Sequence, residues 1–69
     1  MTAKEFVLQH NRRMRAEKII SGRVKGMQTV YWLIREIGNT MYFAEGKTES
    51  NAWVNAKQHI LDRINEKQQ

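Results

Sequence analysis

A cluster of basic side chains in the first third of the chain is the clearest place for chemistry. Three arginines lie within four residues, and a lysine follows them. The planar guanidinium group of arginine forms paired hydrogen bonds with phosphate oxygens and with guanine edges. The cluster therefore predicts contact with nucleic acid. In this interpretation six cationic side chains bind phosphates and one asparagine contacts a base. The predicted nucleic-acid-binding residues are Asn11, Arg12, Arg13, Arg15, Lys18, Arg23 and Lys25.

The distribution of charge supports the same interpretation. The protein has 69 residues and a formal net charge of +5. The first 26 residues carry seven basic and two acidic side chains, whereas residues 27–69 carry five of each. Such clustering steers anionic partners toward the protein and releases counterions when they bind. A charged face that only keeps a small protein soluble is the alternative interpretation.

Enzymatic chemistry has little support in the residue types. The chain has no cysteine, and its two histidines, His10 and His59, are far apart in sequence. The four glycines are scattered and do not form a phosphate-binding loop. We therefore predict a protein that is not an enzyme, with no catalytic residue, no metal, no cofactor and no small-molecule substrate.

Nothing in the sequence predicts a membrane partner. The chain has no run of about 18 apolar residues, and its N-terminus lacks the apolar region of a signal peptide. We therefore expect the protein in the cytoplasm. Proline, internal repeats and low-complexity tracts are absent, so we also expect one domain over residues 1–69.

The basic cluster must be positioned by the N-terminal segment. Thr2 and Glu5 form a capping box, in which the threonine hydroxyl accepts from a backbone amide of the first helical turn. Apolar residues and His10 then recur every three or four positions up to Met14, which predicts a helix over about 3–21 with His10 packed in the core. After Met14 the apolar residues no longer recur at this helical spacing. The alternative is that this helix ends early and residues 19–24 are extended.

A hairpin is expected in the middle of the chain. Residues 29–34 and 40–44 are rich in β-branched and aromatic side chains, which predicts strands over about 28–36 and 40–45. Gly38 and Asn39 fit a two-residue turn that places Ile34 opposite Phe43. Both faces of this ribbon are apolar, so it needs a helix on each face or a ribbon from a second copy.

The last segment predicts an amphipathic helix over about 49–66, capped by Thr48 or Ser50, with an apolar stripe that includes Trp53 and Ile60. The predicted fold class is therefore α+β: an N-terminal helix, an antiparallel β-hairpin and a C-terminal amphipathic helix. The predicted core consists of Phe6, Val7, Met14, Val30, Trp32, Ile34, Phe43, Trp53, Ile60 and Ile64.

Two short resemblances point to nucleic acid. Residues 11–18, Asn-Arg-Arg-Met-Arg-Ala-Glu-Lys, resemble the arginine-rich RNA-binding helix of the lambdoid phage antitermination N proteins, with Met14 where those peptides have a polar or charged residue. Residues 29–64 resemble the sheet-plus-helix DNA-binding modules of phage-type integrases, which insert their sheet into the major groove. The exposed residues of that sheet must be polar or basic, whereas here the sheet and its edge offer only Arg35 and Lys47 among apolar neighbours. Neither resemblance identifies a family.

The sequence thus predicts a small, non-enzymatic nucleic-acid-binding accessory or regulatory protein that uses a basic N-terminal helix, with DNA and RNA both open. The alternative is a small protein-binding or inhibitory module of the kind that mobile elements encode. Such a module, as a monomer or a homodimer, would set its basic face against an acidic protein surface.

Overall fold

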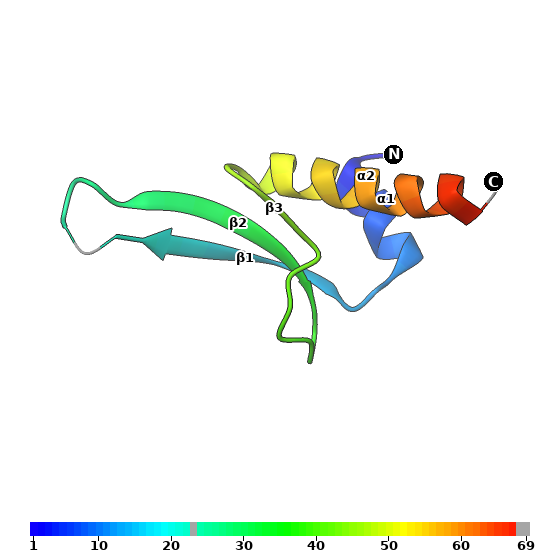
Figure 1. The fold of residues 1–69 in the computed structure, drawn as a ribbon, viewed down its shortest axis with the longest axis horizontal. Coiled ribbons are helices and arrows are strands. Elements are labelled where there is room, and N and C mark those ends of the chain that lie inside the picture. The colour runs from blue at the N-terminus through cyan, green and yellow to red at the C-terminus, as the bar shows by residue number, and fades with distance from the viewer. Residues whose placement is uncertain (23, 68–69) are drawn as a thin grey trace.

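The computed structural model describes residues 1–22 and 24–67, which form two helices and one three-stranded antiparallel sheet of order β1-β2-β3 (Figure 1). This arrangement confirms the predicted α+β class. The elements are α1 (Ala3–His10), β1 (Met14–Ser21), β2 (Thr29–Glu36), β3 (Ala44–Gly46) and α2 (Glu49–Lys67).

Helix α1 begins as predicted but ends much earlier. The Thr2 hydroxyl oxygen accepts from the Glu5 amide at 3.1 Å, as the capping box requires. At the other end Asn11 is extended, with φ −150° and ψ 107°. Its side-chain oxygen accepts from the Arg13 amide at 2.9 Å, and such a local bond competes with helix formation. The predicted helix over 3–21 is therefore wrong beyond His10.

The segment after this turn is a strand. β1 pairs with β2 from Met14↔Glu36 to Ser21↔Thr29. Side chains alternate between the two faces of a strand, so the buried Met14 faces the helices and Arg15 faces the opposite side. The loss of the helical periodicity after Met14 therefore marks the change of structure. The early end of the helix is confirmed, although the strand spans Met14–Ser21 rather than residues 19–24.

Strand β2 agrees with the prediction, whereas its pairing with β3 is shifted by one residue. Ile34 lies opposite Ala44 rather than Phe43. The predicted two-residue turn is absent: the Asn39 amide donates to the Glu36 carbonyl at 3.0 Å in a four-residue turn. Gly38, with φ +88°, occupies the third position of that turn, where a positive φ favours glycine. A loop over residues 37–43 then leads to the short β3.

Both helices lie on the same side of β1 and β2 (Figure 1). The buried side chains described are Val7, Met14, Ile34, Ala44, Ala52, Trp53, Ala56 and Ile60. Of the remaining predicted core, Phe6, Trp32 and Phe43 are partly buried. Val30 and Ile64 are instead 40% and 38% exposed, so those two core predictions are wrong. Of the two ways to cover the hairpin, a helix on each face is wrong for the residues described, because the second face carries no helix, and a ribbon from a second copy stays a prediction.

The β1–β2 hairpin extends beyond the rest of the sheet (Figure 1). The last pair between β2 and β3 is Trp32↔Gly46, and three β1–β2 pairs continue past it. We call this outer part of the hairpin, residues 19–31, the arm. It contributes to a molecule that is 47 Å long and only 23 by 22 Å across. Neither described helix has the length and apolar character needed to cross a membrane.

Candidate functional site

The predicted site residues lie along a strand and its two ends rather than on a helix. Asn11 caps α1, and the next two arginines lie in the turn that leads to β1. Arg15 and Lys18 are exposed residues of β1, and Lys25 is exposed in the connection at the tip of the arm. The predicted basic helix is therefore wrong. Arg23 lies outside the described residues.

Two of these arginines are anchored by backbone carbonyls. Arg13 Nη2 donates to the Ile37 carbonyl at 3.2 Å. Arg15 Nη1 donates to the carbonyls of Arg12 and Met14 at 2.9 and 2.8 Å. A guanidinium group has five N–H donors, so both side chains retain donors for an anion. The anchors hold the two positive charges near the start of β1.

Asn11 has a structural role in this arrangement. Its amide nitrogen donates to a carboxylate oxygen of Glu36 at 3.3 Å, and its oxygen accepts from the Arg13 amide. Both halves of the side-chain amide are engaged, which leaves little capacity for recognising a base. We therefore do not keep Asn11 as a base contact in the function proposed below.

The other three described cations are exposed. Within residues 1–22 and 24–67, no hydrogen bond or ion pair engages the side chains of Arg12, Lys18 or Lys25. An extended chain advances about 3.3 Å per residue, so Arg15 and Lys18 are separated by roughly 10 Å along β1, and Arg12 precedes them in the turn. We call Arg12, Arg15, Lys18 and Lys25 the basic row. Side chains alternate along β1, so Arg15 points to the side opposite the helices, whereas Lys18, like Met14, points to the helix side. The row therefore places its charges on both sides of one strand.

The sheet face opposite the helices, which we call the open face, adds to this surface. It carries Arg15, Glu17 and Ile19 of β1 and their partners Arg35, Leu33 and Tyr31 of β2. Glu17 forms an ion pair with Arg35, and both side chains are 39% exposed. Because Arg35 neutralises Glu17, Arg15 supplies the net charge of this face. The sequence does not reveal this contribution, because a helix over 3–21 would not place Arg15 beside Arg35.

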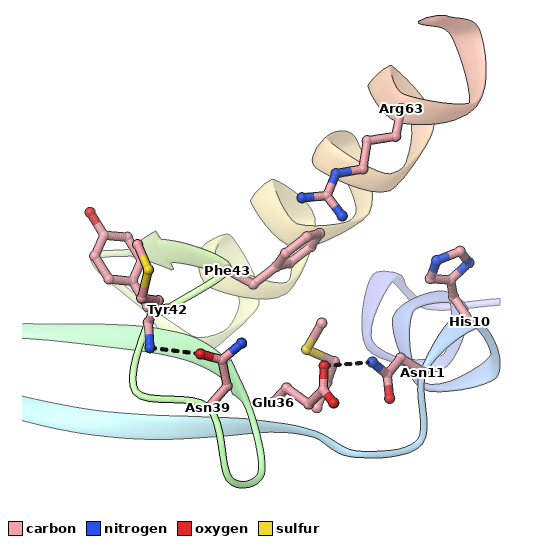
Figure 2. A pocket seen from close by; sticks show the side chains of 9 residues that line it. His10, Asn11, Glu36, Asn39, Tyr42, Phe43 and Arg63 are labelled. Carbon is pink, nitrogen blue, oxygen red and sulfur yellow. Dashed lines mark hydrogen bonds between the residues drawn. The ribbon is translucent and has the colours of Figure 1, made fainter. Parts of the chain in front are cut away.

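A hollow of about 340 Å³ lies between the end of α1, the loop over residues 37–43 and α2 (Figure 2). Figure 2 shows Arg63 reaching from α2 over the Phe43 ring, 5.2 Å from its centroid. His10 also lines the hollow and is exposed, so the prediction of a packed histidine is wrong. The Asn11–Glu36 and Asn39–Met41 hydrogen bonds occupy polar groups of the wall.

The described lining of this hollow includes the ionisable side chains of His10, Glu36 and Arg63 and contains no serine, threonine or cysteine. In the part of the chain that the structure describes, no three His, Asp or Glu side chains gather into a metal site. The exposed cations of the basic row lie elsewhere, on β1 and at its two ends, and form the candidate site.

No family model, curated protein or solved structure matches this chain. Function must accordingly be inferred from the charge and shape of the surface.

Proposed function

We propose that this chain is a small, non-enzymatic nucleic-acid-binding accessory or regulatory protein of the cytoplasm, and that its basic row holds the phosphate backbone. The observation that carries the proposal is the placement of exposed cations along one strand and its ends. Phosphate contacts provide most of the affinity in such complexes without reading sequence. Arg23 stays a predicted phosphate contact on the sequence alone.

The helical side of the molecule differs in charge. Helix α2 contains three acidic and three basic residues, so it has no net charge of its own. Two lysines of the helices lie over aromatic rings: Lys4 Nζ is 5.9 Å from the Trp53 ring centroid, and Lys57 Nζ is 5.2 Å from that of Phe6. A polyanion would therefore approach β1 and the arm in preference to the helices.

Fluorescence anisotropy over a range of salt concentrations tests the proposal, with a labelled DNA duplex and a labelled RNA hairpin as ligands. Four phosphate contacts predict a slope of about −4 for the logarithm of duplex affinity against the logarithm of salt concentration. The double variant Arg12→Gln/Lys18→Gln removes two of these contacts. Its slope should be smaller in magnitude by about two units, and its binding weaker by at least about tenfold at low salt.

The matched control is Lys4→Gln/Lys57→Gln, which removes the same charge from the helical side. Its salt slope should change by less than about one unit. Equal losses in the two variants would mean that net charge alone drives binding, and would overturn the assignment to the basic row. Absence of binding to both ligands at about 50 mM salt would overturn the proposed function. The tighter ligand decides between DNA and RNA.

A second candidate function is the protein-binding or inhibitory module, as a monomer or a homodimer. The observation that favours it is the exposure of Met41 and Tyr42, at 75% and 55%, in the loop over residues 37–43. Apolar side chains gathered on a surface mark interaction sites. If this surface joins two copies, the midpoint of thermal unfolding should rise with protein concentration.

A further inference from the structure

The tip of the arm is apolar although the described chain leaves it uncovered. Val24 is 59% exposed and Met27 is 77% exposed. Behind them the cross-strand pair Ile20↔Val30 is 57% and 40% exposed. Clustered exposed apolar groups of this kind usually mark a contact surface.

The charges around the tip indicate what kind of partner it contacts. Residues 18–35 contain no aspartate and no glutamate, whereas Lys18 and Lys25 lie at the base and the tip of the arm. Two such arms would repel each other, which disfavours a second copy as the occupant. An anionic polymer is complementary in charge to the whole segment.

The shape of the arm suits the groove of a duplex. It is a two-stranded ribbon that projects from the packed part of the molecule along the 47 Å axis (Figure 1). A ribbon of two strands is an element that DNA grooves admit. Proteins that insert apolar side chains between base pairs do so from the minor groove of DNA. The minor groove of A-form RNA is wide and shallow instead, so DNA is the better match.

The backbone turn at the tip has Val24 and Met27 at its two ends. The Met27 amide donates to the Val24 carbonyl at 3.0 Å, which closes a tight turn. Neither side chain has a hydrogen-bonding group to match against base edges. Apolar side chains of this kind act on DNA by entering between base pairs, unstacking them and kinking the duplex.

We propose that Val24 and Met27 insert between stacked base pairs of duplex DNA and bend it, while the basic row holds the adjacent backbone. This inference rests on the proposed function and adds the ligand, duplex DNA, and the consequence of binding. A base step that is already unstacked requires less energy to open. The protein should therefore prefer a duplex with a mismatch over a fully paired one.

The experiment measures bending by energy transfer in a DNA duplex of about 30 base pairs with a dye at each end. Binding of the wild-type protein should bring the ends closer, as a kink of roughly 20–90° requires. The duplex with two adjacent mismatches should bind about tenfold more tightly than the fully paired duplex. Val24→Ser/Met27→Ser should lose both effects and keep the salt slope of the wild type.

Val54→Ser/Met41→Ser is the matched control. It changes the same two residue types at similar exposure, 53% and 75%, on α2 and in the loop over residues 37–43. It should bend DNA as the wild type does. Circular dichroism of each variant verifies that the fold is retained, as the exposure of all four side chains predicts.

The outcomes separate this inference from the proposed function. Binding with the expected salt slope but without bending or mismatch preference would overturn the inference alone. Absence of duplex binding would overturn it, and absence of binding to the RNA hairpin as well would overturn the proposed function too. Equal bending by the tip variant would exclude Val24 and Met27 as the wedge. Binding to phosphatidylserine vesicles that is lost in the tip variant, with bending unchanged, would assign the tip to a lipid surface instead.

Discussion

The β1–β2 hairpin passes through two environments. At its base, Ile34 is completely buried, covered by α2 and beside its cross-strand partner Ala44. On the same face of the same strand, four residues away, Val30 lies in the arm and is 40% exposed. The two residues are both β-branched and apolar, yet only one contributes to a core. Strand pairing alone therefore holds the arm, whereas packing against the helices holds the base.

The largest expected effect tests this difference directly. Ile34→Ala removes a fully buried side chain and should lower the free energy of unfolding by about 2–5 kcal/mol. Val30→Ala should lower it by less than about 1 kcal/mol, since the side chain is already partly in water. Urea unfolding of both variants measures the two losses. Similar losses would show that the arm is packed in solution, and would remove the distinction between arm and base.

Glycine substitutions in the base and in the arm should differ less in their cost to stability. A Cβ atom at Gly46 would lie 2.5 Å from the Ala52 backbone nitrogen, so β3 and α2 must separate to accommodate it. Gly46→Ala should therefore cost about 3 kcal/mol. Gly26, in the arm, has nothing within 4 Å of such an atom but has φ +92°, so Gly26→Ala should cost about 1 kcal/mol through backbone strain.

Thermal unfolding of the two glycine variants makes the comparison. A greater loss in Gly26→Ala than in Gly46→Ala would contradict the close approach of β3 to α2. Because the Gly26 variant alters only the arm, its basic row should retain the wild-type salt slope for duplex binding.

The smallest expected effect on stability comes from the Glu17–Arg35 ion pair, where the base of the hairpin meets the arm. Glu17→Gln removes the ion pair with Arg35, and partly exposed pairs contribute less than about 1 kcal/mol to stability. The change also releases Arg35 and removes a negative charge beside the basic row. Affinity for duplex DNA should rise about two- to fivefold at low salt.

Glu66→Gln is the control for this variant, because it makes the same change in charge at an exposed site near the end of α2. Its affinity for the duplex should remain within about twofold of the wild type. Anisotropy titrations at about 50 mM salt measure both. Equal gains in the two variants would indicate a response to net charge without regard to position.

The elements that the sequence predicted best are those whose signals are local. Helix α2 follows from an apolar stripe every three or four residues and from the Thr48 hydroxyl, which accepts from the Asn51 amide at 3.1 Å. Helix α1 begins at its predicted cap for the same reason. The β2 strand is dense in β-branched and aromatic residues, and its predicted bounds agree with the structure.

The errors occurred where a local signal competed with a distant partner. Residues 14–21 contain helix-forming side chains such as Ala16, Glu17 and Lys18, and pairing with β2 nevertheless decides in favour of the strand. The Asn11 side chain helps by ending α1, but its bond to Glu36 joins residues far apart in sequence. The shifted register between β2 and β3 has a similar cause, because the loop over residues 37–43 is longer than the predicted turn.

In the candidate site too, the residue types follow from the sequence, whereas their positions depend on distant partners. The sequence identified the cations but assigned them to a helix, so it could not place Arg15 on a sheet face beside Arg35. It also counted Val30 as core, because composition does not reveal how far α2 extends along the hairpin.

By itself, the sequence determined the fold class, the helix caps, the amphipathic C-terminal helix and the concentration of positive charge in the first 26 residues. These depend on spacing and residue type over a few turns. Only the tertiary structure decided that the basic residues follow a strand, and that one end of the hairpin is buried while the other projects as the arm. Those features depend on which distant segments pair and on where a helix stops covering a sheet, and no local pattern encodes either.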